Sequence, residues 1–195
     1  MNSILRKSIL GIAGLTVAGG LAAGPLNHTD TTPTTRDAAA VTTQAATPDT
    51  AALIPHGVQG TQSHIDLGDE QTANVKAIIA ATKKAGMDER AAVVSIATAL
   101  QESKLENLGH LGDRNDHDSQ GLFQQRPSSG WGTVEQITDP EYSTTAFLKG
   151  LKQVDGWRDM PLTVAAQTVQ VSAYPDHYAQ WEQQAADLVA QHWNS

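Results

Sequence analysis

The sequence predicts a mainly α-helical domain, an α+β fold with five helices and one small hairpin, within a chain of 195 residues. Apolar residues recur at helical spacing in five stretches between positions 69 and 192. Most of these stretches begin or end at residues that are typical of helix termini, such as Asp88, Pro140 and Gly156. The composition, 39% hydrophobic and 17% charged, suits one globular domain with an additional unfolded part.

The first expected helix begins at Asp69 and stops at Gly86. Acidic residues occupy its first turn and lysines its last turn, as the helix dipole favours. Its apolar face is formed by Val75, Ile78 and Ile79. This pattern is typical of an amphipathic helix at the edge of a core.

The second expected helix runs from the N-cap residue Asp88 to Glu102 and has no charge between Arg90 and Glu102. A helix that is apolar or small on every side belongs inside a domain. The helix dipole disfavours a carboxylate in the last turn, and partial burial favours the protonated acid that a general acid needs. Glu102 is therefore a candidate catalytic residue, and the alternative is a surface glutamate at a frayed helix end. The inward-facing residues are Val93, Ile96, Ala97 and Leu100.

A loop from residue 105 to residue 138 follows this helix. It is too long to be structureless in a compact domain, and loops of this length are usually functional. A small hairpin is expected within it, from Gly121 to Gln125.

Three more helices are expected after the loop. The third begins at Asp139-Pro140 and ends at Gly156, the fourth begins at Pro161, and the fifth follows Pro175. Their apolar positions at helical spacing are Phe147, Leu151 and Val154 in the third, Leu162, Ala165, Ala166, Val169 and Ala173 in the fourth, and Tyr178, Trp181, Ala185, Leu188 and His192 in the fifth.

The start of the chain is expected to lie outside the fold. Arg6 and Lys7 precede an uncharged run from Ser8 to Gly24, which is typical of a secretory signal peptide covering residues 1–24. A membrane anchor is the alternative, but the run is short for one. Residues 25–65 are rich in Thr, Ala and Pro and are expected to form a disordered linker. The folded domain is then expected at residues 66–195 of a secreted protein.

The charge and the cysteine count exclude several functions. No cysteine is present, so thiol catalysis, thiolate metal sites and disulfides are impossible. Removal of the signal peptide leaves 11 of the 13 basic residues against 21 acidic ones, a net charge of −10. Nucleic acid needs a basic face, so it is not an expected partner.

Three segments resemble the lysozyme-like superfamily, in particular the soluble lytic transglycosylases of peptidoglycan. They are Ala99-Leu-Gln-Glu-Ser103, Gly121-Leu-Phe-Gln124 and the region from Ala166 to Trp181. The family has a Glu-Ser pair at the end of a central helix, then a Gly-Leu-Met-Gln-like segment, then an Asn-Ala-Gly motif. The third motif departs here, and Gln170 or Ser172 stands in for its Asn. The sequence that begins at Gly121, Gly-Leu-Phe-Gln-Gln-Arg-Pro-Ser with Gly-Trp-Gly following, also resembles secreted cell-wall proteins of actinobacteria.

The resemblance implies a lysozyme-like helical domain with a small hairpin or loop lobe beside an active-site cleft. It implies cleavage of the β-1,4 bond between N-acetylmuramic acid and N-acetylglucosamine, with Glu102 as general acid and base. In a lytic transglycosylase one Glu suffices, because the muramyl 6-hydroxyl closes a 1,6-anhydro ring. A hydrolytic muramidase would use a second carboxylate. Asp113, Asp116 and Asp118 are the candidates, and turn chemistry is the structural alternative for each of them.

Six residues are candidates for substrate binding, some from their chemistry and some from the resemblance. The amide of Gln124 and the hydroxyl of Ser103 can hydrogen-bond to a sugar. Trp131 lies between two glycines, where its ring is accessible for stacking on a sugar, although it also suits packing over the loop. Tyr178 is at core spacing and is expected in the core. The candidates are Ser103, Gly121, Phe123, Gln124, Trp131 and Tyr174.

No metal or cofactor is expected. Residues 116–121 resemble the start of an EF-hand calcium loop, but Pro127 occupies the position of the closing glutamate. His110 and His117 fit no zinc motif. The expected partner is peptidoglycan, and the expected state is a monomer, extracellular or associated with the cell wall. The alternatives are a non-catalytic peptidoglycan-binding module with the lysozyme fold and an acidic, calcium-dependent surface protein.

Overall fold

The computed structural model describes residues 47–115 and 117–195. The expected signal peptide (1–24), the part of the expected linker up to residue 46, and Asp116 lie outside the described residues. Within the described part of the chain, no helix is long and apolar enough to cross a membrane.

The described residues form a mainly helical fold, as the sequence predicts. The six α-helices of this part of the chain are α1 (Asp69–Lys84), α2 (Glu89–Ser103), α3 (Val134–Ile137), α4 (Pro140–Leu151), α5 (Leu162–Gln170) and α6 (Glu182–His192). Short 3-10 helices connect them: η1 (Gly112–Arg114), η2 (Pro127–Ser129), η3 (Trp157–Asp159) and η4 (His177–Trp181).

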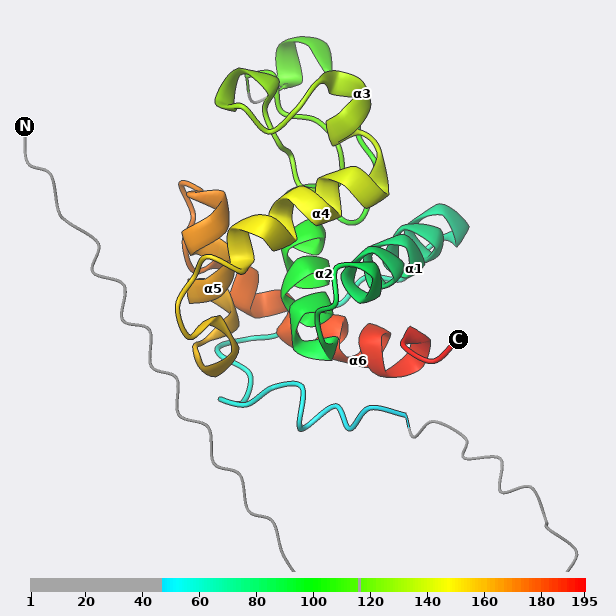
Figure 1. Cartoon of the computed structure of the whole chain (residues 1–195), viewed down its shortest axis with the longest axis vertical. Coiled ribbons are helices and arrows are strands. Elements are labelled where there is room, and N and C mark those ends of the chain that lie inside the picture. Colours follow the sequence, from blue (N-terminus) through cyan, green and yellow to red (C-terminus); the bar gives the residue numbers. More distant parts are fainter. Residues whose placement is uncertain (1–46, 116) are drawn as a thin grey trace, which may run out of the picture. The chain divides into compact units, whose positions relative to one another are not determined.

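Helix α2 is the centre of the domain, and α1, α4, α5 and α6 surround it (Figure 1). Every residue from Ala91 to Leu100 is buried, which explains why this helix has no charged face. It begins where the Asp88 carboxylate accepts a hydrogen bond from the backbone N–H of Ala91 at 3.2 Å. It ends at Lys104, whose left-handed backbone (φ 57°) terminates the helical hydrogen bonds. Both predicted ends of this helix are confirmed to within a residue.

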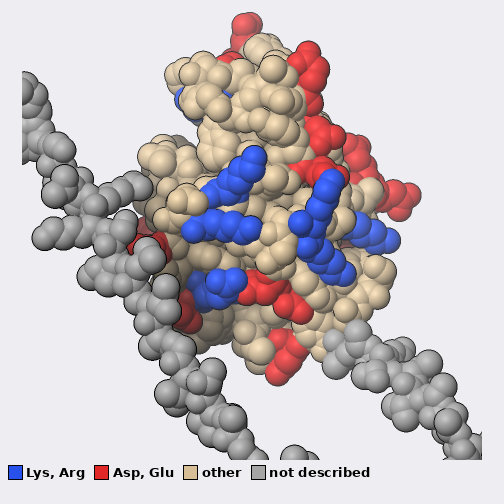
Figure 2. All heavy atoms as spheres, viewed as in Figure 1, with Lys and Arg blue, Asp and Glu red and all other residues tan. Residues whose placement is uncertain are grey.

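Helices α1 and α4 pack against each other, and basic side chains gather over their contact. Figure 2 shows Lys and Arg on this face, with Asp and Glu along its edge. Lys152 donates to the carbonyl of Ala85 at 2.7 Å, and Lys84 forms an ion pair with Glu141. Lys84 lies in the last turn of α1, and Lys152 donates to the carbonyl that follows this helix. Both positive charges therefore lie at the negative end of the helix dipole, where they stabilise the helix.

Residues between α2 and α4 form a separate small lobe, which contains η1, η2 and α3 (Figure 1). The predicted hairpin is reduced there to one antiparallel bridge, in which Gln120 and Gln125 exchange two backbone hydrogen bonds of 3.0 Å. The four residues between them form a tight turn, which leaves no length for a ladder. No strand is present among residues 47–115 and 117–195.

The predicted start of the folded domain at residue 66 is too late. Residues 49–65, here called the N-terminal strap, pack against the helical domain. Leu53 and Ile54 are buried in the core, and the guanidinium of Arg90 donates to the Leu53 carbonyl at 2.8 Å. The prediction rested on the Thr- and Ala-rich composition of residues 25–65, in which two apolar residues in a row gave too weak a signal of burial.

Two predicted helix boundaries also differ. Helix α4 ends at Leu151, not at Gly156, and Val154 packs against the core from the following turn. Helix α5 ends at Gln170, because Val171 takes a left-handed backbone (φ 52°). Ala173, predicted to lie on the apolar face of this helix, is therefore outside it and exposed.

Candidate active site

A cavity of about 780 Å³ opens beside the end of α2. Its walls come from the end of α2, from the part of the lobe between Ser119 and Trp131 that includes the end of η2, and from the end of α5 with the loop that follows. Side chains that line it with polar or aromatic groups include Glu102, Gln124, Arg126, Trp131, Gln170 and Tyr174. The cavity is therefore assembled from three segments that are far apart in the sequence.

Glu102 lies in the wall of this cavity, and its side chain is partly buried. The hydroxyl of Tyr178 donates to its Oε1 atom at 2.7 Å, and the amide of Gln170 donates to the same atom at 3.3 Å. Two donors on one oxygen fix the plane of the carboxyl group. Among the described residues that line the cavity, Glu102 is the one acid.

Gln170 connects the carboxyl group to the lobe. Besides Glu102 it donates to the backbone carbonyl of Phe123 at 2.9 Å, so one amide spans from α5 to both other walls. The left-handed residue Val171, which directly follows, turns the chain at this point and leaves its own side chain 79% exposed. A β-branched residue in this conformation is strained, and such strain is concentrated at functional sites.

Tyr178 is the functional candidate that the sequence analysis assigned only to the core. Its ring is fully buried, as predicted, but its hydroxyl reaches Glu102. Burial, together with the negative charge of Glu102 and the hydrogen bond to it, raises the pKa of Tyr178 far above its ordinary value. The phenol therefore stays protonated and remains a donor near neutral pH. No sequence signal pairs two residues that lie 76 positions apart.

Lys104 is the nearest cation that follows Glu102 in the chain. Its ammonium group lies 4.7 Å from the centroid of the Trp181 ring and donates to the carbonyl of Leu100 at 3.0 Å. Burial lowers the pKa of Lys104, and the charge of Glu102 opposes that shift. This lysine contributes positive charge close to the candidate acid without lining the cavity.

Ser103, predicted to bind substrate, has a structural position instead. The side chain is buried, and its hydroxyl donates to the carbonyls of Ala99 at 3.1 Å and Leu122 at 2.9 Å. It does not line the cavity. The two residues of the Glu-Ser pair therefore have different roles. Glu102 lines the cavity, while Ser103 connects α2 to the turn of the lobe through its hydrogen bond to Leu122.

Gly121 and Phe123, also predicted to bind substrate, are packing residues. A side chain on Gly121 would begin 2.0 Å from the carbonyl oxygen of Ile137, and its backbone is left-handed (φ 76°). Phe123 is fully buried and stacks on Phe147 with ring centroids 5.1 Å apart. The Gly-Leu-Phe-Gln segment thus docks the lobe onto α3 and α4, and only its last residue reaches the cavity.

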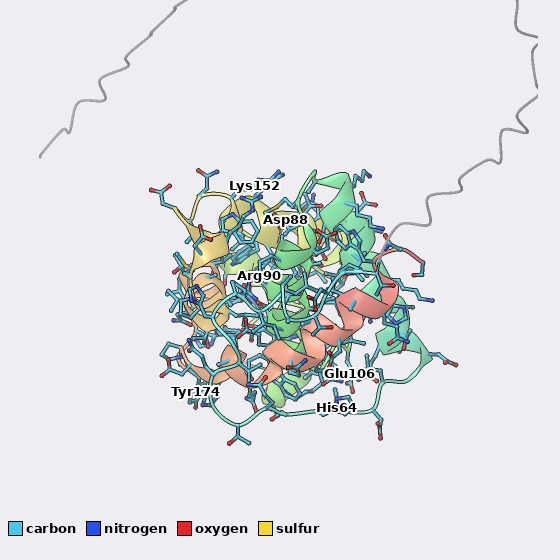
Figure 3. All side chains as sticks on the ribbon, turned by 90° about the horizontal axis from the view of Figure 1, so that it is seen from below. His64, Asp88, Arg90, Glu106, Lys152 and Tyr174 are labelled. Carbon is cyan, nitrogen blue, oxygen red and sulfur yellow. The ribbon has the colours of Figure 1, made fainter. Side chains whose placement is uncertain are left out.

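Gln124, Trp131 and Tyr174 do line the cavity, as predicted. Gln124 takes a left-handed backbone (φ 47°), and its amide donates to the Gly121 carbonyl at 3.0 Å. Trp131 is partly buried. Tyr174 is 62% exposed and stacks on His177 with centroids 4.9 Å apart. Figure 3 places Tyr174 at the periphery of the domain, where its ring is open to a ligand.

The predicted second carboxylates do not line the cavity where the structure describes them. Asp113 is exposed in η1. Asp118 accepts hydrogen bonds from the backbone N–H of Ser128 at 2.8 Å and from its hydroxyl at 2.7 Å, and these bonds lower the pKa of Asp118. Turn chemistry therefore accounts for Asp118. Asp116 lies outside the described residues.

Arg126 is a lining residue that the sequence analysis missed. Its Nε atom donates to the hydroxyl of the buried Ser119 at 3.0 Å. It is the one cationic side chain among the described residues that line the cavity. Within the described residues no group of three or more His, Asp or Glu side chains converges as a metal site.

No protein-family model matches the chain, and no curated protein is significantly similar to it in sequence. The chemistry of the site therefore follows from its geometry alone. Among the described residues, that geometry is one acid with a fixed orientation, in an open cavity with aromatic and amide groups on its walls.

Proposed function

We propose that this protein is a secreted, lysozyme-like enzyme that cleaves the glycan strands of peptidoglycan, with Glu102 as its general acid and base. The observation that supports it most is the place of Glu102. A carboxyl group lies at the end of a buried helix that has no charge between Arg90 and Glu102, in the wall of the cavity, with its orientation fixed by Tyr178 and Gln170. A glycosidase acid needs this combination of partial desolvation and fixed geometry.

In the first step Glu102 protonates the oxygen of the glycosidic bond. Oε1 accepts two hydrogen bonds, so the transferable proton is carried on Oε2. The bond between the muramyl C1 and this oxygen breaks, and the departing N-acetylglucosamine keeps the proton as a hydroxyl group. Positive charge then develops on the muramyl ring, next to the carboxylate that Glu102 has become.

In the second step the same carboxylate acts as a base. It removes the proton of the muramyl 6-hydroxyl while the oxygen of that group bonds to C1, which closes a 1,6-anhydro ring and restores the acid. We favour this outcome over hydrolysis because no second acid lines the described part of the cavity. A muramidase would need a further carboxylate to position water or to act as the nucleophile.

The walls of the groove suit a sugar polymer. Trp131 and Tyr174 supply aromatic faces on which pyranose rings stack, and Gln124 and Gln170 supply amides for hydroxyl and acetamido groups. The groove is open and exceeds the size of one sugar unit, so a strand can pass along it.

The decisive experiment uses the secreted chain, purified peptidoglycan and mass spectrometry of the released fragments. Wild type should release fragments with 1,6-anhydromuramic ends. Glu102→Gln should release none while it keeps its fold, because the amide has the same shape but no acidic proton. Glu106→Gln is the matched control, since Glu106 is exposed and lies four residues further along (Figure 3).

Each result has a definite meaning. Reducing muramic ends would replace ring closure by hydrolysis. Unchanged release by Glu102→Gln would refute the assignment of the acid. Binding to cell walls without any new ends from wild type would show a non-catalytic module.

A further inference from the structure

The short helix η4 holds the end of α2 at two successive residues. Tyr178 donates to Glu102 at 2.7 Å. The indole of Trp181 and the amide of Gln180 both donate to the Oε1 atom of Gln101, at 2.9 Å and 3.1 Å. The orientation of the candidate acid therefore depends on where η4 lies.

Helix η4 is a short element that follows an exposed part of the chain. The four residues that precede it, 173–176, are exposed, and 3-10 helices have poorer hydrogen-bond geometry than α-helices. Its position must be fixed by contacts from other parts of the chain.

The N-terminal strap supplies such contacts. Ser63 donates from its backbone to the Gln180 carbonyl and from its hydroxyl to the Gln180 side chain, both at 2.7 Å. The amide of Gln62 donates to the Ala179 carbonyl at 3.0 Å. Its oxygen accepts at 3.0 Å from the backbone N–H of Gln183, one of the first N–H groups of α6, which have no acceptor within the helix.

Gln180 joins the strap to the candidate acid. Its Oε1 atom accepts from Ser63, and its Nε2 atom donates to Gln101, the neighbour of Glu102. Just beyond, Ile65 and the amide of Gln184 exchange two hydrogen bonds of 3.1 Å and 2.7 Å. The strap therefore lies at a defined place on η4 and α6.

We propose that Gln62 and Ser63 are positioning residues for Glu102, acting through η4. This inference rests on the proposed glycan cleavage for its kinetic consequence, but its structural part is measurable without any substrate. The composition of the N-terminal strap suggests a linker. On this proposal the strap instead helps to support the candidate active site. Neither residue touches the cavity, so their effect is on orientation and not on substrate binding.

The test compares wild type with the double variant Gln62→Ala/Ser63→Ala. Two properties are measured, the kcat and KM for cleavage of peptidoglycan strands and the alkaline titration of tyrosinate absorbance. The chain has three tyrosines, and the pKa of Tyr178 is raised by burial and by Glu102. Subtraction of the titration of a Tyr178→Phe variant isolates this residue. His64→Ala is the control on the same strap, because the side chain of His64 is 72% exposed and points away from the domain (Figure 3).

We expect the double variant to lose about tenfold in kcat with little change in KM, and Tyr178 to ionise at a lower pH than in wild type. Circular dichroism should show the helices intact, and His64→Ala should match wild type in every measurement. If the double variant does not fold, Ser63→Ala alone removes the side-chain hydrogen bond to Gln180 and keeps the backbone one, and Ser63→Thr should restore the side-chain bond. An unchanged Tyr178 titration in a folded variant would overturn the proposal. A wild type without cleavage activity would refute the proposed function instead, and the titration would still decide the role of the strap.

Discussion

The hydroxyl of Tyr178 lies 2.7 Å from Oε1 of Glu102, while the rest of the tyrosine ring is fully enclosed in the core. The ring of Tyr178 thus packs in the core, and its hydroxyl orients the carboxyl group of the candidate acid. Any movement of the core near η4 is transmitted to the carboxyl group through this bond.

Tyr178→Phe should lower kcat by about 10- to 100-fold, because a hydrogen bond to a charged group contributes about 1.5–3 kcal/mol. The ring still fills its place in the core, so the variant should remain folded. The rate is measured from the release of fragments from purified peptidoglycan. Tyr142→Phe serves as the control for removal of a tyrosine hydroxyl outside the cavity. A Tyr178→Phe enzyme as fast as wild type would mean that the bond does not orient Glu102 for catalysis.

Tyr178 should make the protein less stable at alkaline pH. Its pKa in the folded state is raised above the unfolded value of about 10, so above that pH the folded chain binds one proton more than the unfolded chain. The free energy of unfolding should then fall by at most about 1.4 kcal/mol per pH unit. Urea unfolding of wild type and of Tyr178→Phe, at several pH values above and below about 10, measures how the free energy of unfolding depends on pH. All other groups that titrate at alkaline pH are the same in the two proteins. If the free energy of unfolding fell equally steeply with pH in both, the prediction would be contradicted.

Gly121→Ala should destabilise the lobe far more than Gly130→Ala. Both glycines have a left-handed backbone, with φ of 76° and 82°, which costs an alanine about 1–2 kcal/mol. At Gly121 the added carbon also meets the carbonyl oxygen of Ile137 at 2.0 Å, whereas nothing lies within 4 Å of the position at Gly130. Chemical unfolding of both variants gives the difference. Equal losses would show that the contact with Ile137 relaxes without cost.

Glu182→Ala should cost about 3–5 kcal/mol of unfolding free energy, because it leaves Arg90 as an uncompensated buried charge. The two side chains are 8% and 3% exposed, and Nη1 of Arg90 donates to the carboxylate at 2.7 Å. The double variant Arg90→Met/Glu182→Leu should recover most of the loss, since an apolar pair of similar size removes both charges. A double variant no more stable than Glu182→Ala would contradict this account.

The helices were predictable because their termini carry local chemistry. Asp88 and Asp139 cap α2 and α4 with their own carboxylates, and the uncharged run that ends at Glu102 correctly predicts a fully buried helix. Each cap lies within one helical turn, and the uncharged run lies within a single helix. The boundary near Ala173 was wrong because a single left-handed residue, Val171, ends α5 and nothing in its residue type indicates that conformation.

The candidate site was predictable only in part, because spacing along the chain does not distinguish a lining residue from a packing one. Gln124 and Phe123 are neighbours, yet the first faces the cavity and the second stacks on Phe147. The bond between Tyr178 and Glu102 joins two distant segments, and its length depends on the tertiary packing of η4. Long-range contacts of this kind are set by the fold and not by local sequence.

The buried pair of Arg90 and Glu182 has a consequence for the order in which the chain matures. The two residues are 92 positions apart, and the same guanidinium also holds the carbonyl of Leu53. A nascent chain therefore cannot pair its buried Arg90 until Glu182, at the start of α6, has left the ribosome, so fragments that end before Glu182 should remain open to proteases.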